Sequence, residues 1–103
     1  MVDFKDIQTL ADRIAVEFNP ERIILFGSYA AGTAGPDSDV DLLVVLPFEG
    51  KTWKMASKIR SCTRPPFPVD LLARTPQQLE GRLKMNDVFI HEITSKGKVI
   101  YEA

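Results

Sequence analysis

The sequence is poor in cysteine and has no excess of charge of either sign. Its 103 residues contain one cysteine, Cys62, which excludes an internal disulfide and a metal site built from several thiolates. A reducing compartment, the cytoplasm, therefore fits best. Lysines and arginines number 13 against 14 acidic residues, and the formal net charge is −1. Because proteins that bind nucleic acid usually carry a basic excess, direct nucleic-acid binding is not expected.

Long apolar runs are also missing. No stretch approaches the roughly 20 apolar residues of a membrane helix, so no membrane association is expected. The charged segment 1–6 lacks the apolar core of a secretory signal. At 103 residues, of which 45% are apolar, the chain is long enough for one domain with a real core and too short for two. We therefore expect a single domain over residues 1–103.

Hydrophobic patterns predict that helices and strands alternate along the chain. Helical spacing and cap residues predict helices at 4–18, 28–34, 49–62, 75–84 and 86–97. Nearly continuous apolar runs predict strands at 22–26, 40–46, 69–73 and 99–101. This order predicts an α/β fold, with a small mixed β-sheet flanked by helices.

Some single residues carry local predictions. Thr75 and Gln78 stand at the spacing of a capping box, which predicts a helix start. Asn86 is expected to cap the last helix. Cys62 is expected to be a small core residue and Trp53 a packing residue.

A glycine-rich connection between two apolar strands is the most informative part of the chain. It begins with Gly27-Ser28 and ends at Asp39 and Asp41, just where the second strand begins. Since alternate strand residues point to the same face, the two carboxylates are expected to lie side by side. At an effective dielectric constant near 20, such a pair repels by roughly 3 kcal/mol. A divalent metal beside a phosphate-binding loop would explain this arrangement. The alternative is purely structural: Asp39 would cap a helix and Asp41 would be an ordinary surface acid.

Three common motifs do not fit this connection. Gly27 and Gly32 have the glycine spacing of a Walker A loop, but Thr33 follows directly and the lysine is missing. The same residues fail the Gly-x-Gly-x-x-Gly pattern of dinucleotide-binding folds. An EF-hand needs glycine at the sixth position and glutamate at the twelfth, where this sequence has Leu42 and Phe48.

A fourth motif does fit: Gly-Ser, ten residues, then Asp-x-Asp. In this pattern, and in the continuation Ser38-Asp39-Val40-Asp41-Leu42-Leu43-Val44, the chain resembles the DNA polymerase β-like nucleotidyltransferase superfamily. Its ending, Ile93-x-x-x-Gly97-Lys-Val-Ile-Tyr101, is similar to that of the short members called minimal nucleotidyltransferases. The resemblance covers nearly the whole chain and implies the polymerase β-like fold.

The resemblance also implies roles for four motif residues. Gly27 would let the backbone approach a nucleoside triphosphate, and Ser28 would donate to its phosphate oxygens. Asp39 and Asp41 would hold Mg²⁺, or Mn²⁺ in its place. ATP is the expected substrate, although nothing in the sequence reads a base edge.

A third carboxylate lies on a later strand in this superfamily, and Asp70 is the well-placed candidate. It would act as a metal ligand and as a base toward the acceptor hydroxyl. An unpaired carboxylate in so apolar a strand would cost several kcal/mol, so Asp70 needs a partner. The alternative to metal is a salt bridge to a residue such as Arg74.

Minimal nucleotidyltransferases are typically paired with a HEPN-domain toxin, and this resemblance implies the function. The expected activity is transfer of AMP from ATP to a tyrosine hydroxyl of that toxin, with the chain acting as antitoxin. Two alternatives stay open. One is an antitoxin that neutralises its partner by binding alone, with an idle site. The other is a nucleotidyltransferase for a small molecule such as an aminoglycoside.

Overall fold

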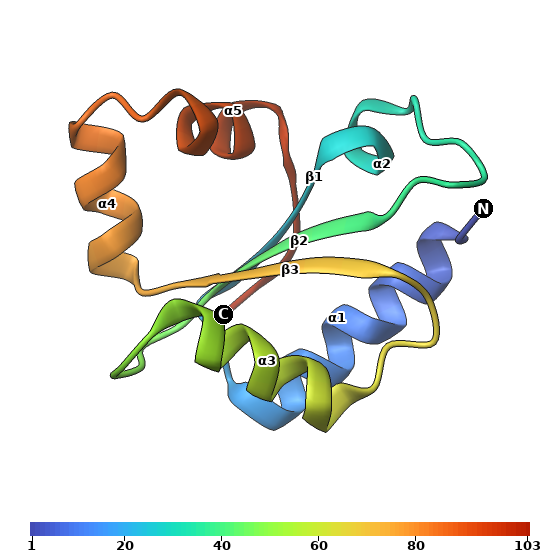
Figure 1. Ribbon diagram of the computed structural model, residues 1–103, viewed down its shortest axis with the longest axis horizontal. Coiled ribbons are helices and arrows are strands. Elements are labelled where there is room, and N and C mark those ends of the chain that lie inside the picture. Colours follow the sequence, from blue (N-terminus) through green and yellow to red (C-terminus); the bar gives the residue numbers. More distant parts are fainter.

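A four-stranded sheet runs through the centre of the protein in the computed structural model, which describes residues 1–103 (Figure 1). The strands are β1 (Arg22–Phe26), β2 (Val40–Val45), β3 (Val69–Arg74) and β4 (Lys98–Glu102). Their order is β3-β2-β1-β4. β2 and β3 are parallel, whereas β1 is antiparallel to both β2 and β4. The expected mixed sheet is confirmed, with β4 at one edge.

Helices cover both faces of this sheet (Figure 1). They are α1 (Phe4–Phe18), α2 (Gly27–Ala31), α3 (Thr52–Thr63), α4 (Pro76–Lys84) and α5 (Val88–Lys96). α1 and α3 lie on one face, α4 and α5 lie on the other, and the short α2 stands at the end of β1. None of these helices has the length and apolar character that crossing a membrane requires.

Two separate cores explain why β1 and β2 are apolar at almost every position. Val40, Leu42 and Val44 of β2 pack into the core beneath α1 and α3. Leu43 and Val45, the alternate residues of the same strand, pack against α4 and α5. A strand that is buried on both faces needs apolar side chains at odd and even positions alike. Asp41 is two residues before Leu43, and alternate strand residues point to the same face. Its side chain therefore lies on the α4–α5 face of the sheet.

Local signals determine the helix ends. The capping box is confirmed: Thr75 Oγ1 accepts from the Gln78 amide at 3.1 Å, and Gln78 Oε1 accepts from the Thr75 amide at 3.0 Å. α1 is capped at Asn19, whose amide donates to the Ala15 carbonyl and whose left-handed φ of 49° turns the chain out of the helix.

The cap of α5 was predicted one residue too early. Asp87 is the cap, because its Oδ1 accepts from the Ile90 amide at 3.1 Å. Asn86 has a φ of 58° instead and forms the left-handed turn between α4 and α5, a conformation that asparagine tolerates well. α3 also begins later than predicted, at Thr52, since Gly50 has a φ of 92°.

Two packing predictions on α3 were wrong. The buried stripe of this helix consists of Ala56, Ile59 and Thr63, and Cys62 lies beside it in solvent. Thr63 can occupy a core position because its hydroxyl donates to the Ile59 carbonyl at 2.7 Å. Trp53 is exposed in the first turn, with the ammonium group of Lys54 5.6 Å from its ring centroid.

Candidate active site

Gly27 joins β1 directly to α2. The chain is extended at Phe26 and turns at Gly27 with a φ of 73°, a left-handed conformation that glycine adopts without strain. Phe26 is the N-cap residue of α2 but offers no side-chain oxygen to the first amides of the helix. The turn therefore presents the backbone of Gly27 and the side chain of Ser28 at the end of β1, where both line a pocket.

The backbone of Gly27 packs against the carboxylate of Asp41. Asp41 stands opposite Phe26 in the β1–β2 ladder, next to the turn. A β-carbon at position 27 would overlap Oδ2 of Asp41 and would lie 3.0 Å from its Cγ. Only glycine fits here, because both the φ angle and the space exclude a side chain. The turn and the acidic residue are therefore one structural unit.

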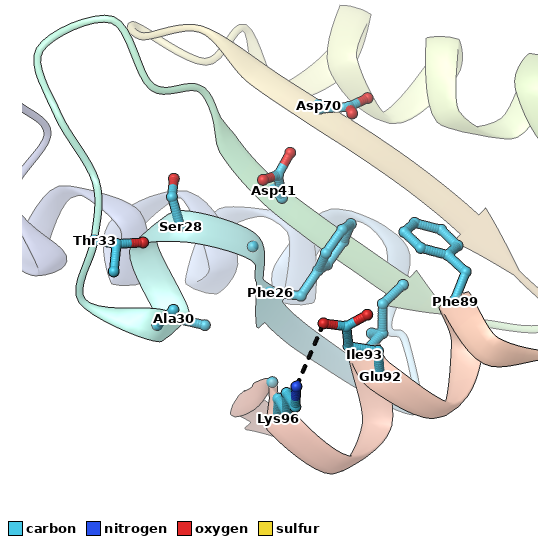
Figure 2. A pocket seen from close by; sticks show the side chains of 13 residues that line it. Phe26, Ser28, Ala30, Thr33, Asp41, Asp70, Phe89, Glu92, Ile93 and Lys96 are labelled. Atoms are coloured by element: carbon cyan, nitrogen blue, oxygen red, sulfur yellow. Dashed lines mark ion pairs between the residues drawn. The ribbon is translucent and has the colours of Figure 1, made fainter.

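Asp41 and Asp70 occupy opposing positions of two parallel strands. The register of β2 and β3 aligns Asp41 with Asp70, and both residues line the pocket beside Gly27 and Ser28 (Figure 2). Burial raises the pKa of Asp41 above its ordinary value of 3.8, and repulsion from Asp70 and then from Asp39 raises this pKa further. Asp70 and Asp39 are thus both close enough to Asp41 to act on its carboxylate electrostatically.

Asp39 lies apart from the other two carboxylates. It precedes β2 and lines a neighbouring hollow of about 420 Å³, together with Arg60, Arg64 and Phe67. No group of three or more acidic, histidine or cysteine side chains is arranged to hold a metal ion. The structure therefore brings Asp41 and Asp70 together in the pocket, with Asp39 beside them in the next hollow.

The alternative partner proposed for Asp70 is not used. Arg74 donates from Nη1 to the carbonyl of Ala73 at 2.7 Å, and no ion pair joins it to Asp70. Asp70 is exposed, so water solvates it without a buried ionic partner. The desolvation expected from its apolar neighbours is therefore small, and Asp70 stands on β3 opposite Asp41.

A pocket of about 690 Å³ opens between α2, the starts of β2 and β3, and α5. Figure 2 shows Ser28 and Thr33 on the α2 side of this space and Phe89, Glu92, Ile93 and Lys96 on the α5 side. Its volume lies within the usual range of small-ligand sites. The α2 side offers backbone and hydroxyl groups, and the α5 side offers an aromatic ring, an aliphatic side chain and two opposite charges.

The α5 wall was not predicted as part of the site. Phe89 packs edge-on against Phe26, with ring centroids 5.9 Å apart and an interplanar angle of 84°. The face of an aromatic ring at a pocket wall can stack on a nucleobase. Lys96 Nζ lies 3.6 Å from Glu92 Oε1, an exposed pair of the kind that contributes only a few tenths of a kcal/mol. Apolar spacing identified α5 as a helix, but nothing local in the sequence indicates what it faces.

The donor set fits a hard divalent cation. Mg²⁺ prefers carboxylate oxygens and completes its shell with water and substrate phosphates, so one or two carboxylates that line the same pocket can serve as its protein ligands. Asp41 also carries an electrostatic cost that a cation would relieve, since its pKa is raised by burial and by two neighbouring acids. A phosphate group bound at Gly27-Ser28 would lie next to these oxygens.

Comparison with known families decides what kind of pocket this is. Residues 7–97 match the family model of the nucleotidyltransferase domain. The chain belongs to the nucleotidyltransferase domain family. The expected enzyme class and fold are thereby confirmed for this nucleotidyltransferase-domain protein, whereas the individual site residues stay predictions. No curated protein matched its sequence.

Solved structures with the same fold include two from toxin–antitoxin systems. A toxin–antitoxin complex with AMP-PNP matches with a TM-score of 0.61 and 24% identity, covering 93% of this chain and 73% of the other. A mutant of the toxin–antitoxin MntA-HpeT matches with a TM-score of 0.57 and 20% identity, over the same shares. A candidate nucleotidyltransferase from Sulfolobus solfataricus matches with a TM-score of 0.65 and 20% identity, over 95% of this chain and 78% of the other.

Proposed function

We propose that this protein is a Mg²⁺-dependent nucleotidyltransferase that transfers AMP from ATP to a hydroxyl group of a partner protein. The observation that carries the proposal is the contact between Gly27 and Asp41. A phosphate-binding turn and a carboxylate suited to metal are packed together in one pocket of nucleotide size. Membership of the nucleotidyltransferase domain family supports the reaction class.

The residues have distinct roles in this proposal. The Gly27 backbone and the Ser28 hydroxyl bind the phosphates, while Asp41 and Asp70, with Asp39 beside them, hold Mg²⁺ or Mn²⁺. The bound metal supplies positive charge that neutralises the triphosphate and the leaving group. Ser28 and Gly27 keep the phosphate chain fixed, so the α-phosphorus lies near the two acids.

The transfer step forms one phosphorus–oxygen bond and breaks another. The acceptor hydroxyl oxygen attacks the α-phosphorus of ATP, and the bond from this phosphorus to the oxygen bridging it to the β-phosphate breaks. Pyrophosphate leaves with that oxygen. The hydroxyl proton passes to Asp70, which is the exposed acid of the pair and therefore faces an incoming acceptor.

We further propose that the acceptor is a tyrosine of a HEPN-domain toxin and that this chain is its antitoxin, acting in the cytoplasm. Two of the structures that share its fold are toxin–antitoxin systems, and one of them contains AMP-PNP. Met85 and Val88 at the α4–α5 connection are exposed apolar side chains, and so is Phe89, which lines the pocket; such a surface suits a covering partner. The free, exposed Cys62 fits a reducing compartment.

Mass spectrometry of the intact partner tests this proposal. The chain is incubated with Mg²⁺, ATP and the HEPN-type protein encoded beside it, and the partner is expected to gain the mass of AMP. An Asp39→Asn, Asp41→Asn double variant should leave the partner unmodified. If the partner is inhibited without any mass change, the chain is a binding antitoxin. If the two proteins form no complex, a small-molecule acceptor becomes the better hypothesis.

A further inference from the structure

Helix α5 supplies the only cation that lines the pocket. Of the 13 lining residues, three are acidic, namely Asp41, Asp70 and Glu92, and Lys96 is the sole lysine or arginine. A nucleoside triphosphate carries several negative charges and would be repelled by three carboxylates. Metal at Asp41 and Asp70 would offset part of this repulsion, but it would leave the distal phosphates without a counter-charge from the protein. A protein cation on the opposite wall would provide one.

The position of Lys96 suits the phosphates and not the base. It is the last residue of α5 and precedes Gly97, which packs on the end of β1 close to the phosphate-binding turn. Figure 2 shows Lys96 at the end of α5 that faces α2, whereas Phe89 lies at the other end. Seven residues of helix separate the two, which corresponds to about 10 Å along the helix axis, so the two side chains can contact different parts of one nucleotide.

Lys96 is held by a partner that it can readily leave. Its Nζ atom lies 3.6 Å from Oε1 of Glu92, one helical turn away, and both side chains are largely exposed, at 77% and 59%. Exposed ion pairs of this spacing are weak, so the exchange of Glu92 for phosphate costs little. Phosphate oxygens accept strong, charge-assisted hydrogen bonds from an ammonium group.

We propose that Lys96 binds the triphosphate of the nucleotide and that Glu92 orients Lys96 while the pocket is empty. This inference rests on the proposed function, because it assumes that the pocket takes ATP. It adds to the site a phosphate ligand from α5, outside the sequence motif. Glu92 then sets the affinity by competing with the phosphates for the same ammonium group.

Calorimetric titration of ATP and of adenosine, each with Mg²⁺ present, tests the assignment. Lys96→Met should raise the Kd for ATP by about tenfold, which is the lower end of the effect of losing a hydrogen bond to a charged group. The same variant should leave adenosine binding unchanged. Lys96→Arg should keep most of the affinity for ATP. Glu92→Gln should tighten ATP binding about twofold by releasing Lys96.

A matched control is available on α4. Lys84 Nζ lies 3.2 Å from Glu80 Oε1 in the same one-turn spacing, equally exposed but outside the pocket, so Lys84→Met should leave both ligands unaffected. The inference is overturned if the protein binds ATP and Lys96→Met binds it equally well, or if Lys96→Met weakens adenosine to the same extent. The role given to Glu92 is overturned if Glu92→Gln has no effect. Failure of the unmodified protein to bind ATP at all would overturn the proposed function itself.

Discussion

The α-carbon of Gly27 lies so close to the Asp41 carboxylate that a β-carbon at position 27 would overlap Oδ2. This contact couples the turn at Gly27 to the first acid of β2. A side chain at position 27 would therefore change two components of the site at once, since it would strain the turn and displace the carboxylate.

Gly27→Ala should abolish nucleotide binding and should destabilise the fold by more than the backbone cost alone. That cost is about 1 kcal/mol for a non-glycine residue in a left-handed conformation. Gly32→Ala is the matched control, because Gly32 has a φ of 76° at the other end of α2 but nothing within 4 Å of its hypothetical β-carbon. Thermal unfolding and ATP titration of both variants distinguish the effect of backbone strain, which both share, from the effect of the overlap with Asp41, which only Gly27→Ala has. Equal behaviour of the two variants would show that the contact with Asp41 is not important.

Asp41→Asn should remove transfer activity without weakening the fold at neutral pH. The raised pKa of Asp41 means that the folded protein binds this proton more tightly than the unfolded chain. Asp41 therefore contributes stability below its ordinary pKa of 3.8, and this contribution is lost as the pH rises through the raised pKa. The asparagine variant should lack that dependence, and at pH 7 its midpoint should equal or exceed that of the unmodified protein.

Leu43→Ala is the structural counterpart of that experiment. Leu43 lies in the same strand, on the same face as Asp41, and is fully buried. Its truncation should lower the free energy of unfolding by about 2–5 kcal/mol. Denaturant titrations of both variants give the comparison. Unfolding of Asp41→Asn instead would mean that the carboxylate stabilises the structure.

Mg²⁺ and ATP together should raise the melting temperature more than either ligand alone. The metal relieves the repulsion between Asp41 and Asp70, and the phosphates complete its coordination shell, so each ligand binds better in the presence of the other. Differential scanning fluorimetry with single and combined ligands measures this linkage. The Asp39→Asn, Asp41→Asn double variant should lose the combined effect, and an equal shift in both proteins would contradict the metal assignment.

Phe89→Ala should weaken ATP and adenosine alike. Stacking of a base on an aromatic side chain is worth about 1–3 kcal/mol, which corresponds to a rise in Kd of about fivefold or more. Val88→Ala serves as the control, because Val88 is the next residue and is 78% exposed, but it does not line the pocket. Calorimetry with both ligands distinguishes this outcome from the phosphate-specific loss expected at Lys96. Unchanged adenosine binding in Phe89→Ala would show that the base lies elsewhere.

The sequence was most informative where physical constraints are local. Period, capping and turn chemistry predicted α1, β1 and the capping box at Thr75. Predictions failed where a neighbour distant in sequence decides the outcome. Cys62 and Trp53 were expected to pack, but they fall outside the stripe of α3 that meets the sheet. The cap of α5 was misassigned because Asn86 and Asp87 are both good candidates until the left-handed turn is known.

The α5 wall is the largest gap between sequence and structure. Phe89 and Ile93 occur in a pattern that is typical of any amphipathic helix, and only the packing of α5 on β1 makes Phe89 part of a pocket. The Glu92–Lys96 pair likewise has the spacing of an ordinary surface pair. The motif residues could be found because glycine and carboxylates in such positions are costly without a ligand, whereas α5 shows no comparable local cost.

A single residue, Gly97, separates the end of α5 from the start of β4. A β-carbon at Gly97 would lie 2.7 Å from Cγ2 of Ile24 and 3.0 Å from the Leu25 carbonyl oxygen. Because this connection is short and closely packed, α5 cannot move away from the sheet as a hinged element. The α5 wall of the pocket is fixed when the sheet forms, so the conformational entropy of ordering it is lost during folding and not during ligand binding. Such a pocket selects its ligand by a shape that exists before the ligand arrives.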